Sequence, residues 1–96
     1  MYNEMAEYFK VLGDPNRLKI VELLLKGETC GCTLIDKLPI TQPTLSYHLN
    51  TLVASGLARN VKDGTKSIHF INQDKLDEII AYLEGLKHLE VESCSL

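Results

Sequence analysis

Apolar residues recur three and four positions apart in several stretches of the chain, which is the pattern of helices that bury one face. The first stretch predicts an amphipathic helix over roughly the first twelve residues. A second helix is expected to begin after Asp14, its N-cap, with Pro15 at the first helical position, and to end at Gly27. The predicted buried face of this second helix carries Leu18, Val21, Leu24 and Leu25.

Two further helices follow in close succession. A short one is predicted at 33–38. Thr33 and Asp36 match the capping pattern S/T-x-x-D/E, and Thr29 is an alternative cap. A longer helix is predicted at 41–55. Helices joined by only a few residues predict a helix-turn-helix, in which the second helix enters the major groove of DNA.

The helix at 41–55 has two faces of different chemistry. It opens with Thr41 as the expected N-cap and Pro43 in the first turn. One face is apolar and carries Leu45, Leu49, Leu52 and Val53. The other offers hydrogen-bonding side chains and no carboxylate, namely Gln42, Thr44, Ser46, Tyr47, His48 and Thr51. Such a face favours an approach to DNA phosphates and base edges, so the first five of these residues are expected to contact DNA. A merely solvated amphipathic helix is the alternative.

After Gly56 the apolar residues alternate with a period of two, which predicts two β-strands at 57–61 and 67–71. The residues between them contain the Asp-Gly dipeptide of tight hairpin turns. This hairpin would form a wing beside the helix-turn-helix. Its cations are expected to contact phosphates or the minor groove, and they are Arg59, Lys62 and Lys66. An ordinary exposed hairpin with solubilising lysines is the alternative interpretation.

A final helix is predicted over about 73–90, with apolar residues at Leu76, Ile79, Ile80, Leu83, Leu86 and Leu89. This is more apolar surface than one small core needs, so we expect the first and last helices to form a dimer interface. The alternative is that they close the core of a monomer. The expected fold class is mainly α (α+β): a winged helix-turn-helix of about five helices with one two-stranded β-hairpin wing. We expect a single domain over 1–96 that forms a homodimer, whose two-fold symmetry matches palindromic DNA.

Charge is distributed unevenly along the chain, whose formal net charge is −3. Residues 41–72 carry three Lys/Arg and one Asp, a net +2, whereas residues 73–96 carry two Lys and six acids, a net −4. The positive segment coincides with the predicted DNA-binding helix and wing, as a DNA-facing surface requires. The chain has no apolar run of 18 residues and no signal-peptide pattern, so a cytoplasmic protein without membrane association is expected.

Two cysteines one residue apart, Cys30 and Cys32, stand just ahead of the predicted short helix, and Cys94 lies near the carboxyl end. On a regular helix, positions i and i+2 are about 200° apart, so both sulfurs reach one ion only where the backbone is not regular helix. Gly31 makes that backbone permissive, and we expect binding to reshape the start of the short helix. Thiolates select soft species such as As(III), Sb(III), Cd(II), Cu(I) or Zn(II). Without a nearby histidine, two or three sulfurs favour a three-coordinate metalloid over tetrahedral zinc.

The runs ETCGCTL, TQPTLSYHL and KDGTK resemble the ArsR/SmtB family of winged-helix metalloregulatory repressors, in particular its arsenic-responsive members. The resemblance implies a homodimer that binds double-stranded operator DNA and represses a resistance operon until As(III) or Sb(III) binds cysteine thiolates. No cofactor is expected for folding. Cys30 and Cys32 occupy the two thiol positions of the family motif. The third thiol of some members corresponds to Ile35, so Cys94, from the same or the partner chain, is the candidate third ligand. The zinc site on the last helix of other members is not expected, because Leu76 stands at a histidine position.

Three functions are compatible with these features. The first, which is not enzymatic, is a repressor released by As(III) or Sb(III). The second keeps the DNA binding but responds to oxidants, persulfides, Cd(II) or Zn(II). The third is a small thiol oxidoreductase, which is disfavoured because the chain has no Cys-x-x-Cys at the start of a helix after a strand. His69 and His88 receive no role in any of them.

Overall fold

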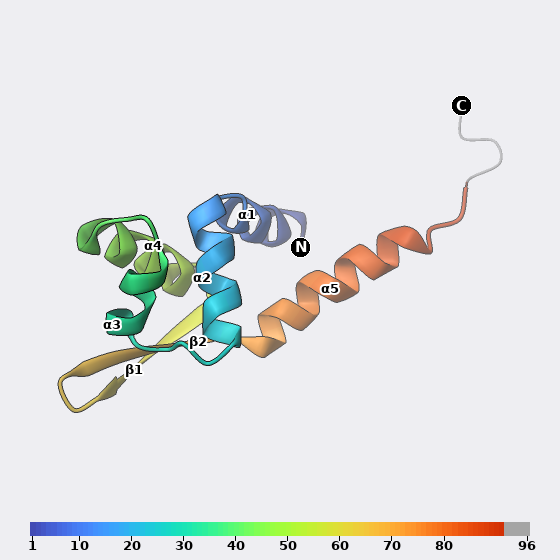
Figure 1. Cartoon of the computed structure of the whole chain (residues 1–96). Helices are drawn as coiled ribbons and strands as arrows, with labels where there is room; N and C mark the ends of the chain where they lie inside the picture. Colours follow the sequence, from blue (N-terminus) through green and yellow to red (C-terminus); the bar gives the residue numbers. More distant parts are fainter. Residues whose placement is uncertain (92–96) are drawn as a thin grey trace.

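The computed structural model describes residues 1–91, and over that range the chain forms a winged helix-turn-helix, as predicted (Figure 1). Its elements are α1 (Tyr2–Leu12), α2 (Pro15–Leu25), α3 (Gly31–Leu34) with a following 3₁₀ turn η1 (Ile35–Lys37), α4 (Gln42–Ala54), β1 (Ala58–Asp63), β2 (Lys66–Ile71) and α5 (Gln73–Lys87). Figure 1 shows α5 extending away from the body that α1 to α4 form, with the hairpin projecting from the opposite side.

The start of α2 follows the local signals in the sequence. The carboxylate of Asp14 accepts hydrogen bonds from the backbone N–H groups of Asn16 and Arg17, at 2.9 and 3.1 Å. These two N–H groups have no partner within the helix, so the cap stabilises the helix by about 1 kcal/mol. Pro15 occupies the first turn, as expected. The helix ends at Leu25, and Gly27 follows in the left-handed region with φ 99°.

The face of α2 that meets the core differs from the predicted one. Ile20, Leu23 and Leu24 are buried, whereas Leu18 and Leu25 are 55% and 46% exposed. Apolar residues occupy two neighbouring stripes of this helix, both at helical spacing, so the sequence pattern did not distinguish them. The choice was made by α1, α4 and β2, which all pack against α2.

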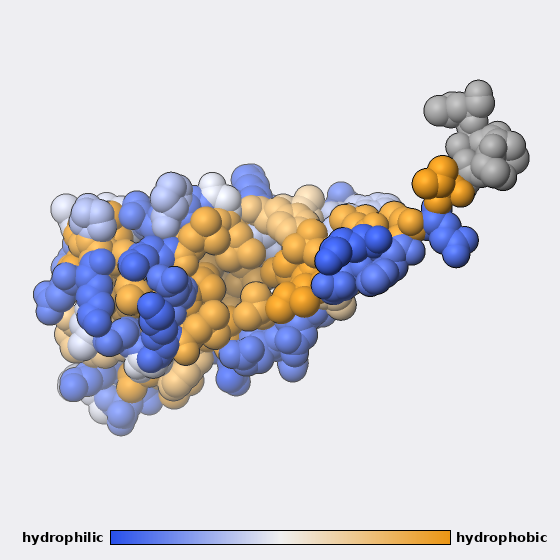
Figure 2. All heavy atoms as spheres, turned by 45° about the vertical axis from the view of Figure 1, so that its right-hand side comes forward, coloured by the Kyte–Doolittle hydropathy of each residue, from blue (hydrophilic) through white to orange (hydrophobic). Residues whose placement is uncertain are grey.

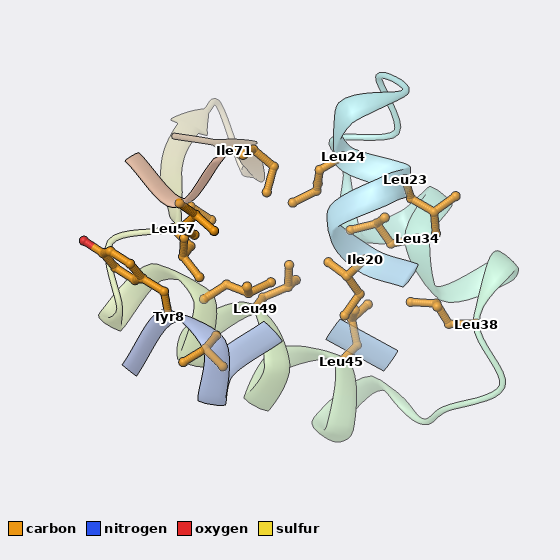
Figure 3. Packing of buried hydrophobic residues seen from close by; sticks show 14 of the residues in the cluster. Tyr8, Ile20, Leu23, Leu24, Leu34, Leu38, Leu45, Leu49, Leu57 and Ile71 are labelled. Carbon is orange, nitrogen blue, oxygen red and sulfur yellow. The ribbon is translucent and has the colours of Figure 1, made fainter. Parts of the chain in front are cut away.

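The core joins every helix of the helix-turn-helix to α2 (Figure 3). Ile20 of α2, Leu34 of α3 and Leu45 of α4 are among the most completely buried side chains. Complete burial of each stabilises the fold by about 1.5–3 kcal/mol. Tyr8 of α1 and Ile71 of β2 extend the same cluster. As a result, α3 and α4 are held on α2 by apolar contacts.

The hairpin pairs in antiparallel register from Ala58 opposite Ile71 to Asp63 opposite Lys66. The strands reach further into the predicted loop than expected, and Gly64 has the positive φ of 64° that the tight turn requires. Strand β2 also contacts the chain ahead of α3. Cys30 forms an isolated antiparallel bridge with Ile68. The wing is therefore attached to the segment that carries the cysteines.

Most of the apolar residues on α5 remain on the surface. Ile79 is buried, but Ile80, Leu83 and Leu86 are 51%, 45% and 46% exposed. Figure 2 shows apolar residues gathered along this helix. The expectation that α5 carries more apolar surface than the core of one chain uses is confirmed. Among the described residues, no helix is both long and apolar enough to cross a membrane.

Candidate functional site

The two cysteines of the motif share one cavity with the outer surface of α4 and the inner face of the hairpin. This thiol cavity has a volume of about 380 Å³. Its lining comes from the start of α3, from α4 and from the hairpin, and includes Cys30, Cys32, Gln42, Ser46, Asn50, Asn60, Lys66 and His69. Candidate thiol ligands and candidate DNA-contacting residues thus lie around the same hollow.

Cys30 itself caps α3, a role that the sequence prediction gave to Thr33 or Thr29. Its backbone is extended, with φ −93° and ψ 136°, and its Sγ accepts the backbone N–H of Cys32 at 3.4 Å. The hydroxyl of Thr33 instead donates to the carbonyl of Cys30 at 2.9 Å. The short helix therefore begins at Gly31, two residues before the predicted start. Because Cys30 is extended and Cys32 is in the first turn, both side chains can line one cavity.

The two thiols are not equivalent. The hydrogen bond from the Cys32 side chain, together with the bond from the Cys32 backbone N–H, lowers the pKa of Cys30. The same side-chain bond raises the pKa of Cys32. The ammonium group of Lys66 favours the thiolate form of both. Cys30 is thus the first of the pair to ionise. Cys94, the expected third thiol, lies outside the described residues.

His69 is a site residue that sequence reasoning missed. It lies in β2, is only 5% exposed, and lines the thiol cavity. Its Nδ1 has no hydrogen-bond partner among residues 1–91, and burial lowers its pKa. The available signal was the period-two alternation, which places His69 on the same inward face as the buried Ile71. The premise that no histidine lies near the cysteines is therefore wrong, because strand pairing brings His69 beside a segment that is distant in sequence.

The first two turns of α4 present exposed polar side chains. Gln42 and Ser46 are exposed, and Tyr47 is 64% exposed. Thr44 is half-buried, and its hydroxyl accepts a 3.0 Å hydrogen bond from the hydroxyl of Thr41. Thr41 occupies the N-cap position as predicted, but its side chain makes no capping hydrogen bond to the backbone. The free N–H groups of this helix end are left for other partners.

His48 does not lie on the outer face of α4, where we had expected it. It is 6% exposed, because it stands three residues after Leu45 and next to Leu49 on the buried side. Its Nδ1 lies 2.9 Å from Nη1 of Arg17, whose Nε donates to the carbonyl of Val11 at 2.6 Å. His48 thus joins α4 to α2 and to the end of α1 instead of facing a ligand.

The three predicted wing cations are exposed but lie on different faces of the hairpin. Residues that pair across the strands share a face, so Lys62, opposite Ser67, lies on the side of the thiol cavity. Arg59, opposite Phe70, lies on the other side. Lys66, opposite Asp63 at the tip, has the same register as Arg59, but it is among the residues that line the cavity. None of the three cations forms an ion pair within residues 1–91.

The chain is similar to known proteins in sequence and in fold. The family described as "Bacterial regulatory protein, arsR family" matches residues 14–60, from the cap of α2 into β1. An uncharacterized HTH-type transcriptional regulator of Methanocaldococcus jannaschii is 43% identical over 86 residues, which cover 88% of this chain and 97% of that protein. The arsenical resistance operon repressor of Staphylococcus xylosus is 42% identical over 78 residues, covering 81% of this chain and 75% of that one.

Solved structures agree with the sequence comparison. An ArsR-like transcriptional regulator from Rhodococcus sp. RHA1 has a TM-score of 0.77 and 30% identity, and the match covers 90% of this chain and 81% of that one. A homodimeric winged helix-turn-helix DNA-binding domain from Mycobacterium bovis has a TM-score of 0.73 and 25% identity, covering 93% and 84%. The chain belongs to the ArsR family of helix-turn-helix transcriptional regulators.

Proposed function

We propose that this protein is a homodimeric repressor that leaves its operator DNA when As(III) or Sb(III) binds the thiolates of Cys30 and Cys32. The single observation that carries the proposal is the thiol cavity. Cys30 and Cys32 line it together with Gln42 and Ser46 of α4 and with Lys66 of the wing. A ligand on the sulfurs therefore occupies space beside the groups proposed to touch DNA.

The DNA surface consists of the amino-terminal half of α4 and the wing. Exposed Gln42, Ser46 and Tyr47, with the half-buried Thr44, supply donors and acceptors for base edges and phosphates. The positive end of the helix dipole adds to this attraction, and the first turn of α4 holds no acid to oppose it. Arg59, Lys62 and Lys66 supply the phosphate contacts. His48 takes no direct part in this proposal, because it is buried against Arg17.

The first and last helices supply the dimer interface. Ile80, Leu83 and Leu86 of α5 are about half exposed, and a hollow lined by Tyr2, Tyr82 and Leu86 runs between the two helices. A second copy that covers this apolar surface would stabilise both chains. The homodimeric relative from Mycobacterium bovis supports this assembly. The free thiols of the cavity fit a reducing, cytoplasmic location.

The chemistry of induction is ligand exchange at arsenic. Each thiol loses its proton and forms an As–S bond, and each departing hydroxide leaves arsenous acid as water, so two thiols bind with release of two waters. Cys30 reacts first, because its pKa is the lower of the two. Cys94, of the same or the partner chain, is the candidate third sulfur. The filled cavity then displaces Lys66 and the start of α4 from the DNA.

The test is release of DNA by arsenite under reducing conditions. A duplex selected from random sequences by the native protein serves as the operator. Arsenite should release the native protein, whereas Cys30→Ser and Cys32→Ser should stay bound. The behaviour of Cys94→Ser decides between two and three sulfur ligands. A native complex that survives excess arsenite contradicts the metalloid assignment. If oxidant or persulfide alone releases the DNA, the redox alternative takes its place.

A further inference from the structure

We infer that the outer stripe of α2, formed by Leu18, Val21 and Leu25, is a docking surface for helix α5 of a second copy of this chain. The inference rests on the homodimer of the proposed function, but it concerns a face that the interface of the first and last helices leaves out. It gives a role to exposed leucines that neither the core nor the thiol cavity uses.

The outer stripe is an apolar line along one side of α2. Its residues stand three and four positions apart, which places them on one face of a helix. Leu18 and Leu25 are 55% and 46% exposed, and Val21 is half-buried. At about 100° per residue, the two leucines lie roughly 140–160° around the helix from Ile20, which is fully buried in the core. Helix α2 thus carries a second apolar face in addition to the one that its own core uses.

The rest of the described chain does not cover this stripe. Helices α1 and α4 and strand β2 pack against other sides of α2. Figure 1 shows α5 running away from the body instead of folding back over α2. The radius of gyration is accordingly 16.3 Å, whereas a compact domain of about 100 residues has one of about 13 Å. Most of α5 therefore has no body to lie on within residues 1–91, and the outer stripe has no cover.

Apolar surface continues from α5 onto the body of the molecule. Ile80, Leu83 and Leu86 are 51%, 45% and 46% exposed on α5. In Figure 2, apolar residues run along α5 and extend over the adjoining body in the same view. A single chain rarely leaves so much apolar surface uncovered unless that surface is an interaction site. Since a two-fold dimer uses the same surface on both copies, the outer stripe of each copy can receive the α5 face of the other.

Charge decides whether α5 pairs with a second α5 or with the outer stripe. Between Gln73 and Lys87 the helix carries four acids and two lysines, a net −2. Between Pro15 and Lys26 the chain carries three cations and one acid, a net +2. Two α5 helices lying side by side would bring like charges together, whereas α5 on the outer stripe brings opposite charges together. The outer stripe is therefore the better docking surface for the partner's α5.

This contact connects the dimer interface to the helix proposed to bind DNA. Helix α2 carries the outer stripe on one side, and on the other its Ile20 shares the core with Leu34 of α3 and Leu45 of α4. Because an α-helix is about 10 Å across with its side chains, the partner's α5 would lie only one helix behind that core. The docking on α2 thus fixes how far apart the two copies of α4 stand, which sets the spacing of two DNA half-sites.

The first experiment measures the dimer dissociation constant of the reduced full chain by sedimentation equilibrium. Leu25→Glu should raise that constant at least about tenfold, because it buries a carboxylate against an acidic helix. Leu25→Lys should raise it about two- to fivefold less than Leu25→Glu does, since its ammonium group meets the acids of α5. Val61→Glu is the matched control, because Val61 is 47% exposed but lies on the wing. Its dissociation constant should match the native value within about twofold.

A second measurement uses the native chain, so it does not depend on how a variant folds. Hydroxyl-radical footprinting with mass spectrometry compares the oxidation of side chains above and below the dimer dissociation constant. Leu18 and Leu25 should lose most of their oxidation in the dimer, whereas Val61 should be oxidised equally in both states.

The outcomes separate this inference from the proposed function. If Leu83→Glu dissociates the dimer while Leu25→Glu stays within about twofold of the native constant, the inference is wrong and the dimer of the proposed function stands. Equal effects of Leu25→Glu and Leu25→Lys, or no protection of Leu18 and Leu25, also overturn the docking of α5 on α2. A native chain that stays monomeric at every concentration overturns the dimer and the inference together, and arsenite release of DNA then tests the remainder of the proposed function.

Discussion

Replacing Arg17 with Met should destabilise the fold by disconnecting three helices at once. Nη1 of Arg17 contacts Nδ1 of the buried His48 on α4 at 2.9 Å, and its Nε donates to the carbonyl of Val11 at the end of α1 at 2.6 Å. Methionine keeps most of the aliphatic stem, so the change removes hydrogen bonds more than packing.

The size of the effect follows from these two contacts. A hydrogen bond from a charged donor contributes about 1.5–3 kcal/mol, and part of that is the penalty for leaving the buried acceptor unpaired. The two bonds share one side chain and are not additive, so we expect a loss of about 2–4 kcal/mol. For a domain of this size that corresponds to a decrease in Tm of at least about 8 °C.

The assay is urea unfolding followed by circular dichroism, at one fixed protein concentration because a dimer is expected. The matched control is Lys19→Met on the same helix, whose ion pair with Glu22 is exposed and should contribute less than about 1 kcal/mol. Arg17→Met combined with His48→Leu should recover part of the loss, since removal of both partners leaves no buried acceptor at that contact. If Arg17→Met costs no more than Lys19→Met, the connecting role assigned to Arg17 is wrong.

Three further predictions concern the site and the interface. In a Cys94→Ser background, iodoacetamide should modify Cys30 at a lower pH than Cys32, because the lowered pKa of Cys30 gives its thiolate first as pH rises. Peptide mass spectrometry across a pH series measures the modification of each cysteine. Reaction of the more exposed Cys32 at the lower pH would contradict this prediction. Lys62→Ala should weaken binding to all DNA duplexes alike and reduce by about 1 the slope of the logarithm of the binding constant against the logarithm of salt concentration. Ser46→Ala should instead relax the preference for one DNA sequence. Binding titrations of several duplexes at several salt concentrations separate the two effects. Leu83→Glu should convert the dimer to monomer in analytical ultracentrifugation, and an unchanged sedimentation coefficient would remove α5 from the interface.

The sequence by itself determined the features that depend on neighbouring residues. Asp14 and Pro15 begin α2 where expected, because a cap needs only the next few N–H groups. The hairpin follows from period-two alternation and from Gly64 at its turn, and the order of helices and strands then indicates the winged helix-turn-helix. The excess of apolar residues on α5 was also visible in the pattern.

Only the tertiary structure decided which of several plausible faces turns inward. Leu18 is exposed, because packing of α1, α4 and β2 selected one of two apolar stripes on α2. His48 is buried beside Leu45 and Leu49 on α4, where Arg17 of α2 contacts its ring. Cys30 became a helix cap because β2 holds its backbone extended. His69 lines the same cavity as the cysteines, because β2 is hydrogen-bonded to the segment ahead of α3. Periodicity in the sequence shows which face of its own helix or strand a residue occupies. The other residues that line a site come from different elements, and how those elements approach one another depends on the packing of the whole chain.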